Sequence, residues 1–322
     1  MRCVSVAVSV ALAAGFLSPA WAQAPVRGGR VARIPVIRYG ADRADLPYEE
    51  PHAKEKQALY RRINEERMAA GLAPLEYSLR AAKAADLFCR DSAEKGYTGH
   101  WDLAGRAPYL RWADAGGVDQ HAQNFASESR SPGPIVGSPK EMLLGSHARM
   151  MAEVPPHDGH RRTVLDPDWT HVGIGVAVVG GEFRMSEEYV RKLMDWVEVP
   201  ARPLPAGSEA PFAAKAPAGW NVGVVEVRRE PVPRAMTPQE TAERRTYALP
   251  PVIRQIYAMP GNGMVWASGE KGSFPVAPDG EFRFTVPLDH GPGDYYVVVF
   301  ASKGPFTGKP VTPATIARIR AE

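Results

Sequence analysis

Cysteine is nearly absent from this chain. The 322 residues include two cysteines, Cys3 and Cys89. Cys3 lies in a short apolar N-terminal stretch that has the pattern of a secretory signal, so Cys89 alone is expected to remain after cleavage. A single cysteine excludes an intramolecular disulfide. We interpret Cys89 as a buried, inert thiol, because it follows Leu87 and Phe88 on an expected helix.

Long apolar runs and an excess of one charge are also missing. The signal-like segment, residues 1–22, has Arg2 near its start and an apolar run that is too short for a membrane span. No later run reaches the roughly 18 apolar residues of a transmembrane helix. The 39 basic and 36 acidic residues nearly balance, which disfavours a nucleic-acid partner. We therefore expect a secreted or periplasmic protein, cleaved near Ala22, that binds no nucleic acid and has no transmembrane segment.

Two common hydrolase motifs are absent. The chain has no Gly-x-Ser-x-Gly elbow, which disfavours a serine hydrolase of the α/β-hydrolase type. The nearest approach to a zincin motif is the pair His157 and His160, but no Glu stands between these histidines. Gly159 and the prolines before it also argue against a helix here. A protease of the zincin type is therefore disfavoured.

The order of patterns along the chain predicts two folded domains. Residues 23–52 are rich in Pro, Arg and Gly and are expected to form an extended leader. Residues 53–200 show helical patterns first and strand patterns later, which predicts an α+β layered domain. A Pro/Ala-rich stretch, 201–218, is expected to be a linker. Short strand-like runs separated by Gly, Pro and Asp turns then predict a small all-β sandwich over 219–322.

Local signals place the main elements of the α+β domain. Helices are expected at 55–70, after the capping residue Ser78, and from Ser138 to about Glu153, where a cap, a proline and an acid follow one another. The β-branched run 171–179 is the clearest strand, and it ends in a Gly-Gly turn that predicts a hairpin.

Five segments of this domain, in this order, resemble the CAP superfamily of cysteine-rich secretory, antigen 5 and pathogenesis-related proteins, also called SCP-like. The resemblance covers about residues 55–190 and is of the bacterial secreted type. The matching segments are Ile63-Asn64-Glu65-Glu66-Arg67 with Gly71-Leu72-Ala73-Pro74-Leu75, Gly99-His100, Gln123-Asn124, Gly159-His160-Arg161, and Leu165-Asp166-Pro167 with Thr170-His171-Val172-Gly173-Ile174-Gly175.

The resemblance implies an α-β-α sandwich with a central cleft that holds two histidines and two glutamates. In some members of the family this tetrad binds zinc or another divalent ion. Carried over to this chain, the histidines are His100 and His160, and they are the predicted metal ligands. Gln123 stands where the family has its first glutamate, so one expected acid is replaced by an amide.

The second glutamate position falls on the helix that starts at Ser138. The best register puts Arg149 there, with His147 half a turn earlier and Glu153 one turn later. The predicted cleft or ligand-binding residues are therefore His100, Gln123, Asn124, His147, Glu153 and His160, and no catalytic residue is assigned. Aromatic residues near the first histidine, such as Trp101 and Phe125, either pack in the core or line an apolar cleft.

These patterns favour a non-enzymatic extracellular or periplasmic binding module. Its histidine-lined cleft is expected to hold a metal, a lipid or a peptide, and the C-terminal domain is expected to dock on a protein partner or the cell envelope. The cofactor expected, if any, is zinc or another divalent ion. The alternative is a metal-dependent, peptidase-like hydrolase that uses the same histidine pair, with Glu153 or Asp102 as the base.

Overall fold

The computed structural model describes residues 49–130, 132–200, 203–260, 264–266, 268–304 and 312–322. The expected signal peptide, and the expected leader up to residue 48, lie outside the described residues. The chain forms two compact units. The first unit runs up to Leu103 and continues over Ala122–Tyr189 and Thr237–Ala248, and the second unit takes Ala104–His121, Val190–Met236 and Leu249–Glu322. None of the described helices is long and apolar enough to cross a membrane.

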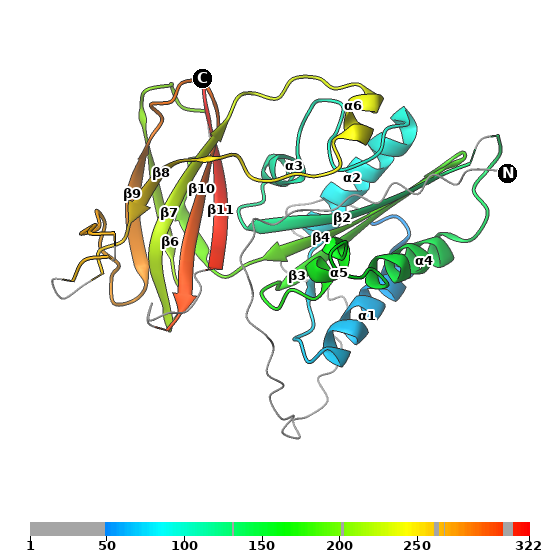
Figure 1. Cartoon of the computed structure of the whole chain (residues 1–322), viewed down its shortest axis with the longest axis horizontal. Coiled ribbons are helices and arrows are strands. Elements are labelled where there is room, and N and C mark those ends of the chain that lie inside the picture. Colours follow the sequence, from blue (N-terminus) through cyan, green and yellow to red (C-terminus); the bar gives the residue numbers. More distant parts are fainter. Residues whose placement is uncertain (1–48, 131, 201–202, 261–263, 267, 305–311) are drawn as a thin grey trace. The chain divides into compact units, whose positions relative to one another are not determined.

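The first unit contains the predicted helices and the predicted hairpin (Figure 1). Its elements are α1 (Ala53–Ala69), β1 (Glu76–Tyr77), α2 (Leu79–Lys95), β2 (Gln120–Ser129), α4 (Pro139–Met151), α5 (Gly159–Val164), β3 (His171–Val179), β4 (Glu182–Arg191) and α6 (Pro238–Glu243). Strand β2 begins, and β4 ends, with two residues that belong to the second unit.

Helix starts follow the sequence signals closely. The Ser78 side chain accepts a hydrogen bond from the Ala81 N–H at the start of α2. Ser138 and Glu141 form a complete capping box on α4, with Pro139 in its first turn. Met142, Leu143 and Met150 of α4 are buried as their spacing predicts. Val154, which the same pattern marks as buried, lies beyond the end of α4 and is exposed, because the helix stops at Met151.

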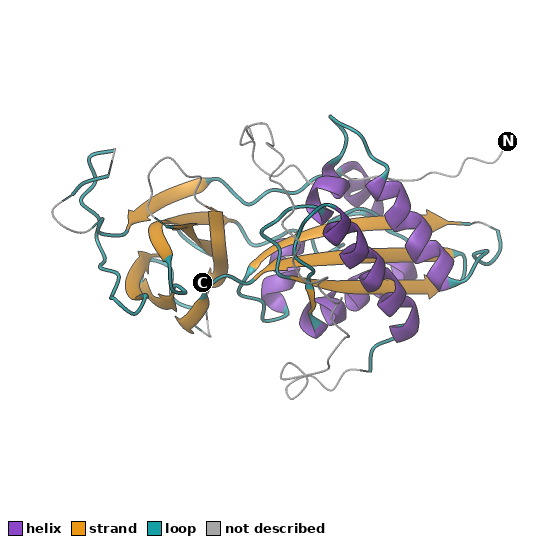
Figure 2. Cartoon of the chain, turned by 90° about the horizontal axis from the view of Figure 1, so that it is seen from below, coloured by secondary structure: helices purple, strands orange, loops and turns teal. Residues whose placement is uncertain are grey.

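The sheet of the first unit has the strand order β1-β3-β4-β2, so β2 is an edge strand. Helix α2 packs on one face of this sheet. A Cβ added at Gly173 or Gly175 of β3 would lie 2.3 Å or 2.4 Å from the α2 backbone, so glycine is what allows this close approach. Figure 2 shows helices running alongside the long strands.

The opposite face of the sheet packs against α1 and α4 in the main core of the first unit. Contributions come from α1 (Leu59, Tyr60, Ile63), α4 (Met142, Leu143), β3 (Val172, Ile174, Val176) and β4 (Phe183, Met185, Tyr189). Helices on both faces of one sheet make the α-β-α sandwich that the family resemblance implies.

The second unit contains two sheets packed around their own core, as predicted for an all-β sandwich. One sheet has the order β11-β10-β7-β8 and the other β5-β6-β9. The elements are α3 (Pro108–Asp114), β5 (Asp195–Glu198), β6 (Glu209–Lys215), β7 (Trp220–Glu230), β8 (Val252–Tyr257), β9 (Glu281–Pro287), β10 (Gly293–Lys303) and β11 (Thr312–Ala321). Phe212, Phe282 and Phe284 stack in this core with ring centroids 5.6–6.0 Å apart.

Three local expectations differ from the structure. The segment expected to be a linker, 201–218, contains β6, which pairs with β9 and buries Phe212 despite its alanines and prolines. The sequence shows a strand-like run at 263–268, but β8 lies earlier, at Val252–Tyr257. A short helix, α5, begins at Gly159, where the sequence argued against one. His157 precedes this helix, so His157 and His160 still do not share one helical face.

Candidate functional site

Strand β2 presents two neighbouring amide side chains, Gln123 and Asn124. Successive side chains on a strand point to opposite faces of the sheet. Gln123 bonds to Glu188 of β4, whereas Asn124 bonds to Glu187 of β4, so each amide finds a carboxylate on its own face. The site therefore has two polar clusters, one on each side of the sheet.

The first cluster is built around His100, which follows the end of α2 and is 0% exposed. Its Nδ1 lies 2.8 Å from Oε1 of Gln123, and Nε2 of Gln123 donates to Oε1 of Glu188 over 2.8 Å. An amide oxygen can only accept, so Nδ1 of His100 carries the proton in this arrangement. Ser186 also donates to the Glu188 carboxylate, at 2.5 Å. A fixed chain of donors thus runs from His100 to Glu188.

The second cluster is built around His147 of α4, which is 0% exposed. Its ring nitrogens lie 2.7 Å from the Glu187 carboxylate and 2.8 Å from the Glu66 carboxylate of α1. Burial by itself lowers the pKa of His147, but the two carboxylates outweigh burial and raise it to about 9. The same contacts lower the pKa of both glutamates, against the upward effect of their burial. His147 is therefore an imidazolium that ties α4, α1 and β4 together.

His160 lies beside the second cluster at the start of α5. Its backbone N–H donates to Glu153 over 3.0 Å, and its Nδ1 lies 2.5 Å from the same carboxylate. Its backbone carbonyl accepts from Asn124 over 3.2 Å. Its Nε2 is buried and has no hydrogen-bond partner among the described residues. Glu153 thus orients the imidazole and leaves one ring nitrogen unused.

A segment from the C-terminal half of the chain covers His100. We call residues Thr237–Ala248, which include α6, the 237–248 strap. The ring of Tyr247 meets the His100 ring edge-on with centroids 4.9 Å apart. Trp101 donates its indole N–H to the Thr246 carbonyl over 3.0 Å, and the Arg244 guanidinium lies over its ring at 3.4 Å. The imidazole is therefore closed off by the protein's own chain.

All six predicted site residues lie in the first unit. Hydrogen bonds link them in groups: His100 with Gln123, Asn124 with His160, and His160 with Glu153. Asn124 reaches His147 through Glu187, to which both bond. Arg149 is not part of either cluster, because its side chain is 49% exposed and pairs with Glu128.

Sequence reasoning missed the acids that complete both clusters, Glu187 and Glu188, and it missed Tyr247. The run Ser186-Glu187-Glu188-Tyr189 carries a usable signal, because four consecutive residues with polar atoms continue a strand pattern that begins with a tight turn. All four are buried. Buried acids on both faces of a strand require partners, which directs attention to the neighbouring strand.

Three aromatic residues near the histidine segments, Phe125, Trp112 and Tyr109, pack against other rings. Phe125 contacts Phe88, and the Trp112 ring stacks on His121 at 5.4 Å in the second unit. Tyr109 packs edge-on against Tyr296, also in the second unit.

The histidines and acids of the two clusters are the donor groups available to a resident metal ion. Zinc sites use three or four protein ligands. In the described ranges, no three side chains from His, Cys, Asp and Glu form a group that could hold a metal ion. Nδ1 of His100 and both ring nitrogens of His147 already bond to side chains of the protein. The donor groups of the described residues do not fit a resident zinc ion, which counts against the metal binding predicted for His100 and His160.

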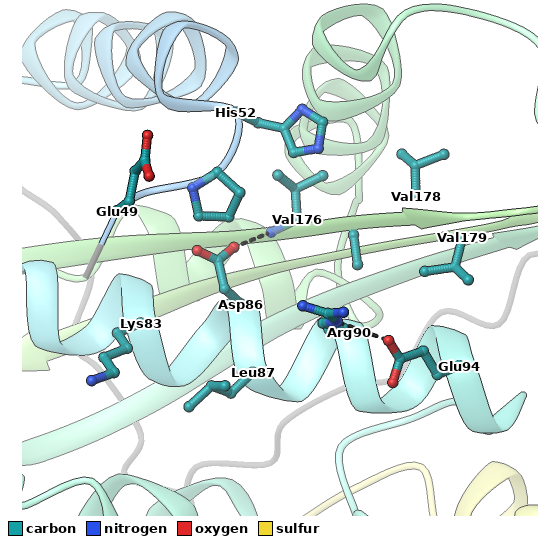
Figure 3. Close-up of a pocket in the computed structure, with 12 residues that line it drawn as sticks. Glu49, His52, Lys83, Asp86, Leu87, Arg90, Glu94, Val176, Val178 and Val179 are labelled. Carbon is teal, nitrogen blue, oxygen red and sulfur yellow. Dashed lines mark hydrogen bonds and ion pairs between the residues drawn. The ribbon is translucent and has the colours of Figure 1, made fainter. Parts of the chain in front are cut away.

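A separate hollow of about 530 Å³ is lined by residues of α2 and β3 and by Glu49, Pro51 and His52 (Figure 3). Its buried carboxylate, Asp86, accepts from the Val176 N–H over 2.9 Å and from Lys56 over 2.5 Å. These bonds join α1, α2 and β3, so the acid has a structural role. None of the predicted site residues lines this hollow.

Three of the solved structures that are similar to part of this chain are bacterial proteins. An outer surface protein from Borrelia burgdorferi has 16% sequence identity and a TM-score of 0.36, and the match covers 45% of this chain and 98% of that chain. An extracellular protein containing a SCP domain from Bacillus anthracis has 17% identity and a TM-score of 0.34, and the match covers 45% of each chain. A cysteine-rich secretory protein from Staphylococcus aureus has 20% identity and a TM-score of 0.30, and the match covers 45% of this chain and 42% of that chain. The match spans less than half the length of the Bacillus and Staphylococcus chains.

No curated protein matches the sequence. The model of the cysteine-rich secretory protein family, CAP, matches residues 60–190. That range begins within α1, ends within β4 and includes the residues of both polar clusters. The 237–248 strap lies outside it. Residues 60–190 are therefore a CAP domain, a member of the cysteine-rich secretory protein family.

Proposed function

We propose that this protein is an exported, non-enzymatic binding module whose CAP domain recognises an extended peptide at the surface formed by His100, Trp101 and Gln123. The observation that carries the proposal is that this surface holds a polypeptide segment in the structure. The Trp101 indole bonds to a backbone carbonyl, and His100 contacts a tyrosine ring. Export is supported by the signal-like pattern of residues 1–22 and by the family of the domain.

The chemistry around His100 favours binding over catalysis. A histidine that acts as a general base usually has a carboxylate on its second nitrogen, which stabilises the imidazolium as it forms. In this protein that partner is the Gln123 amide. The amide fixes the ring and its proton but supplies no charge, so His100 is suited to hold a ligand in place.

The experiment is a selection of random displayed peptides on the full chain and, in parallel, on its Tyr247→Ala variant, because Tyr247 covers His100. Enriched peptides are then titrated by calorimetry. We expect binding that weakens at least tenfold in His100→Gln and is unchanged in His157→Gln, an exposed histidine. Mass spectrometry is expected to recover the bound peptide intact. Enrichment of no peptide whose binding depends on His100 would contradict the proposal.

One observation favours the alternative, a metal-dependent hydrolase that uses His100 and His160. The Glu153–His160 pair leaves a buried ring nitrogen without a partner among the described residues, which is the arrangement of an oriented base or ligand. The donor set described above counts against it. Turnover of peptide or ester substrates with saturating divalent ion, lost in His160→Gln, would support the hydrolase and displace the binding module.

A further inference from the structure

We propose that the 237–248 strap is an intramolecular ligand of the His100 surface, and that the free ligand is an extended peptide with an arginine and a tyrosine three residues apart. This inference rests on the proposed function, because it names the chemistry of the peptide. Three contacts define the site: one for the tyrosine, one for the peptide backbone and one for the arginine.

The tyrosine contact uses the open edge of the sheet. The backbone N–H of Gln123 donates to the Tyr247 hydroxyl over 2.6 Å, and the hydroxyl lies 3.4 Å from the Gln123 carbonyl. Because β2 is an edge strand, these are the backbone groups that an added strand would pair. One phenol satisfies both groups and places its ring on His100. The site therefore selects a hydroxylated aromatic side chain.

The backbone and arginine contacts both use Trp101. Its indole N–H donates to the backbone carbonyl of Thr246, the residue before the tyrosine, so this contact recognises the peptide backbone and not a particular side chain. The Arg244 guanidinium lies over the ring, at a distance typical of a cation–π interaction. The spacing from Arg244 to Tyr247 sets the order of the two side chains in the ligand.

The strap is attached weakly enough to leave its site. Thr241 is its one buried residue, and the others are half-buried or exposed. Its short helix has its own capping box of Thr237 and Glu240, so α6 needs little support from the sheet. The close contact of α6 with the domain is at Gly99, where an added Cβ would lie 2.8 Å from the Thr241 carbonyl. Segments with few buried contacts open locally without global unfolding.

The experiment measures competition between the strap and a free copy of it. The probe is a fluorescein-labelled synthetic peptide of residues 237–248, titrated by fluorescence anisotropy against the full chain. The variants are Tyr247→Ala, Tyr247→Phe and the control Tyr257→Ala, a half-buried tyrosine of β8 in the second unit.

A tethered segment competes at an effective concentration on the order of millimolar. We therefore expect Tyr247→Ala to bind the probe at least tenfold more tightly than wild type and Tyr257→Ala, with Tyr247→Phe between them. A probe with alanine in place of its tyrosine is expected to bind at least tenfold more weakly. Equal binding of the probe by wild type and Tyr247→Ala, or no binding by either, would overturn the inference.

Two further readouts separate this inference from the proposed function. Trypsin under native conditions is expected to cut after Arg244 and Arg245 at least tenfold faster in Tyr247→Ala than in Tyr257→Ala. Cutting at equal rates would mean that the strap is fixed by other contacts and would overturn the inference. Library peptides that bind wild type and Tyr247→Ala equally would also overturn it, while leaving the proposed function standing. If no peptide of any sequence binds either chain, the proposed function itself fails.

Discussion

The buried imidazolium of His147 predicts a specific dependence of stability on pH. Its ordinary pKa is 6.5, and contacts with Glu187 and Glu66 outweigh burial and raise it to about 9 in the folded chain. The folded state therefore holds a proton between these two values that the unfolded state has released. Stability falls with pH wherever the folded state binds more protons. The contribution is complete below pH 6.5, declines from there to about pH 9, and is lost above that value.

The magnitude follows from the interval between the two pKa values. Each pH unit corresponds to about 1.4 kcal/mol, so the interval represents a contribution of about 3 kcal/mol. The side chain of His147 is 0% exposed, and so is that of Glu187, so solvent screens this contact little. The second carboxylate, Glu66, is 16% exposed and contributes less.

The assay is urea unfolding of wild type, His147→Gln and His157→Gln between about pH 6 and pH 10. Wild type and His157→Gln, whose histidine is exposed, are expected to lose about 3 kcal/mol more across this range than His147→Gln. The glutamine variant is expected to be less stable at about pH 6, because it leaves a buried carboxylate without its cation. A difference between wild type and His147→Gln that stays constant with pH would refute the reasoning, as would one that grows.

Three further predictions test other parts of the structure. Gly175→Ala is expected to destabilise the first unit by about 3 kcal/mol or more in thermal unfolding, because the added Cβ would meet the α2 backbone. Gly145→Ala in α4 has room for a Cβ and is expected to stabilise the unit by about 0.5–1 kcal/mol. Equal effects of the two substitutions would contradict the close packing of α2 on β3. Gln123→Glu is expected to lower stability by placing two carboxylates together, and adding Glu188→Gln is expected to recover most of the loss, which a double-mutant cycle in urea measures. A calorimetric zinc titration is expected to show no low-micromolar binding that depends on His100 and His160, because the described residues hold no group of three metal ligands. Zinc binding that is lost in both His100→Ala and His160→Ala would contradict this prediction.

The elements of the fold with strong local signals could be predicted from the sequence. The capping residues Ser78 and Ser138 form hydrogen bonds with residues three positions further along the chain, so the local sequence is enough to predict these helix starts. Strand β3 has β-branched residues that alternate with glycines, and those glycines also indicate that a helix packs closely on the strand. Strand β2 could not be predicted, because several of its buried residues are polar and the strand therefore has no alternating apolar pattern. These polar side chains find hydrogen-bond partners on β4, which is distant in the sequence.

The candidate site was predictable in part for the same reason. His100, Gln123 and His160 could be found because they stand in segments that resemble the family. Tyr247 could not be found, because it lies outside the segments that resemble the family and meets His100 only through tertiary packing between distant parts of the chain. The contact depends on the path of the strap, which has one buried residue and hence almost no pattern of its own.

The family resemblance places a glutamate at position 123, and the neighbouring strand offers a physical reason for the glutamine that this chain has there. Glu188 already places a buried carboxylate beside this position, at hydrogen-bond distance from the Gln123 side chain. A second carboxylate there would face it across a medium of low dielectric, where like charges repel strongly. An amide avoids that repulsion because its nitrogen donates to Glu188 while its oxygen accepts from His100. Gln123 therefore keeps the imidazole in place without adding a second carboxylate beside it, which supports the proposed binding role over that of a general base.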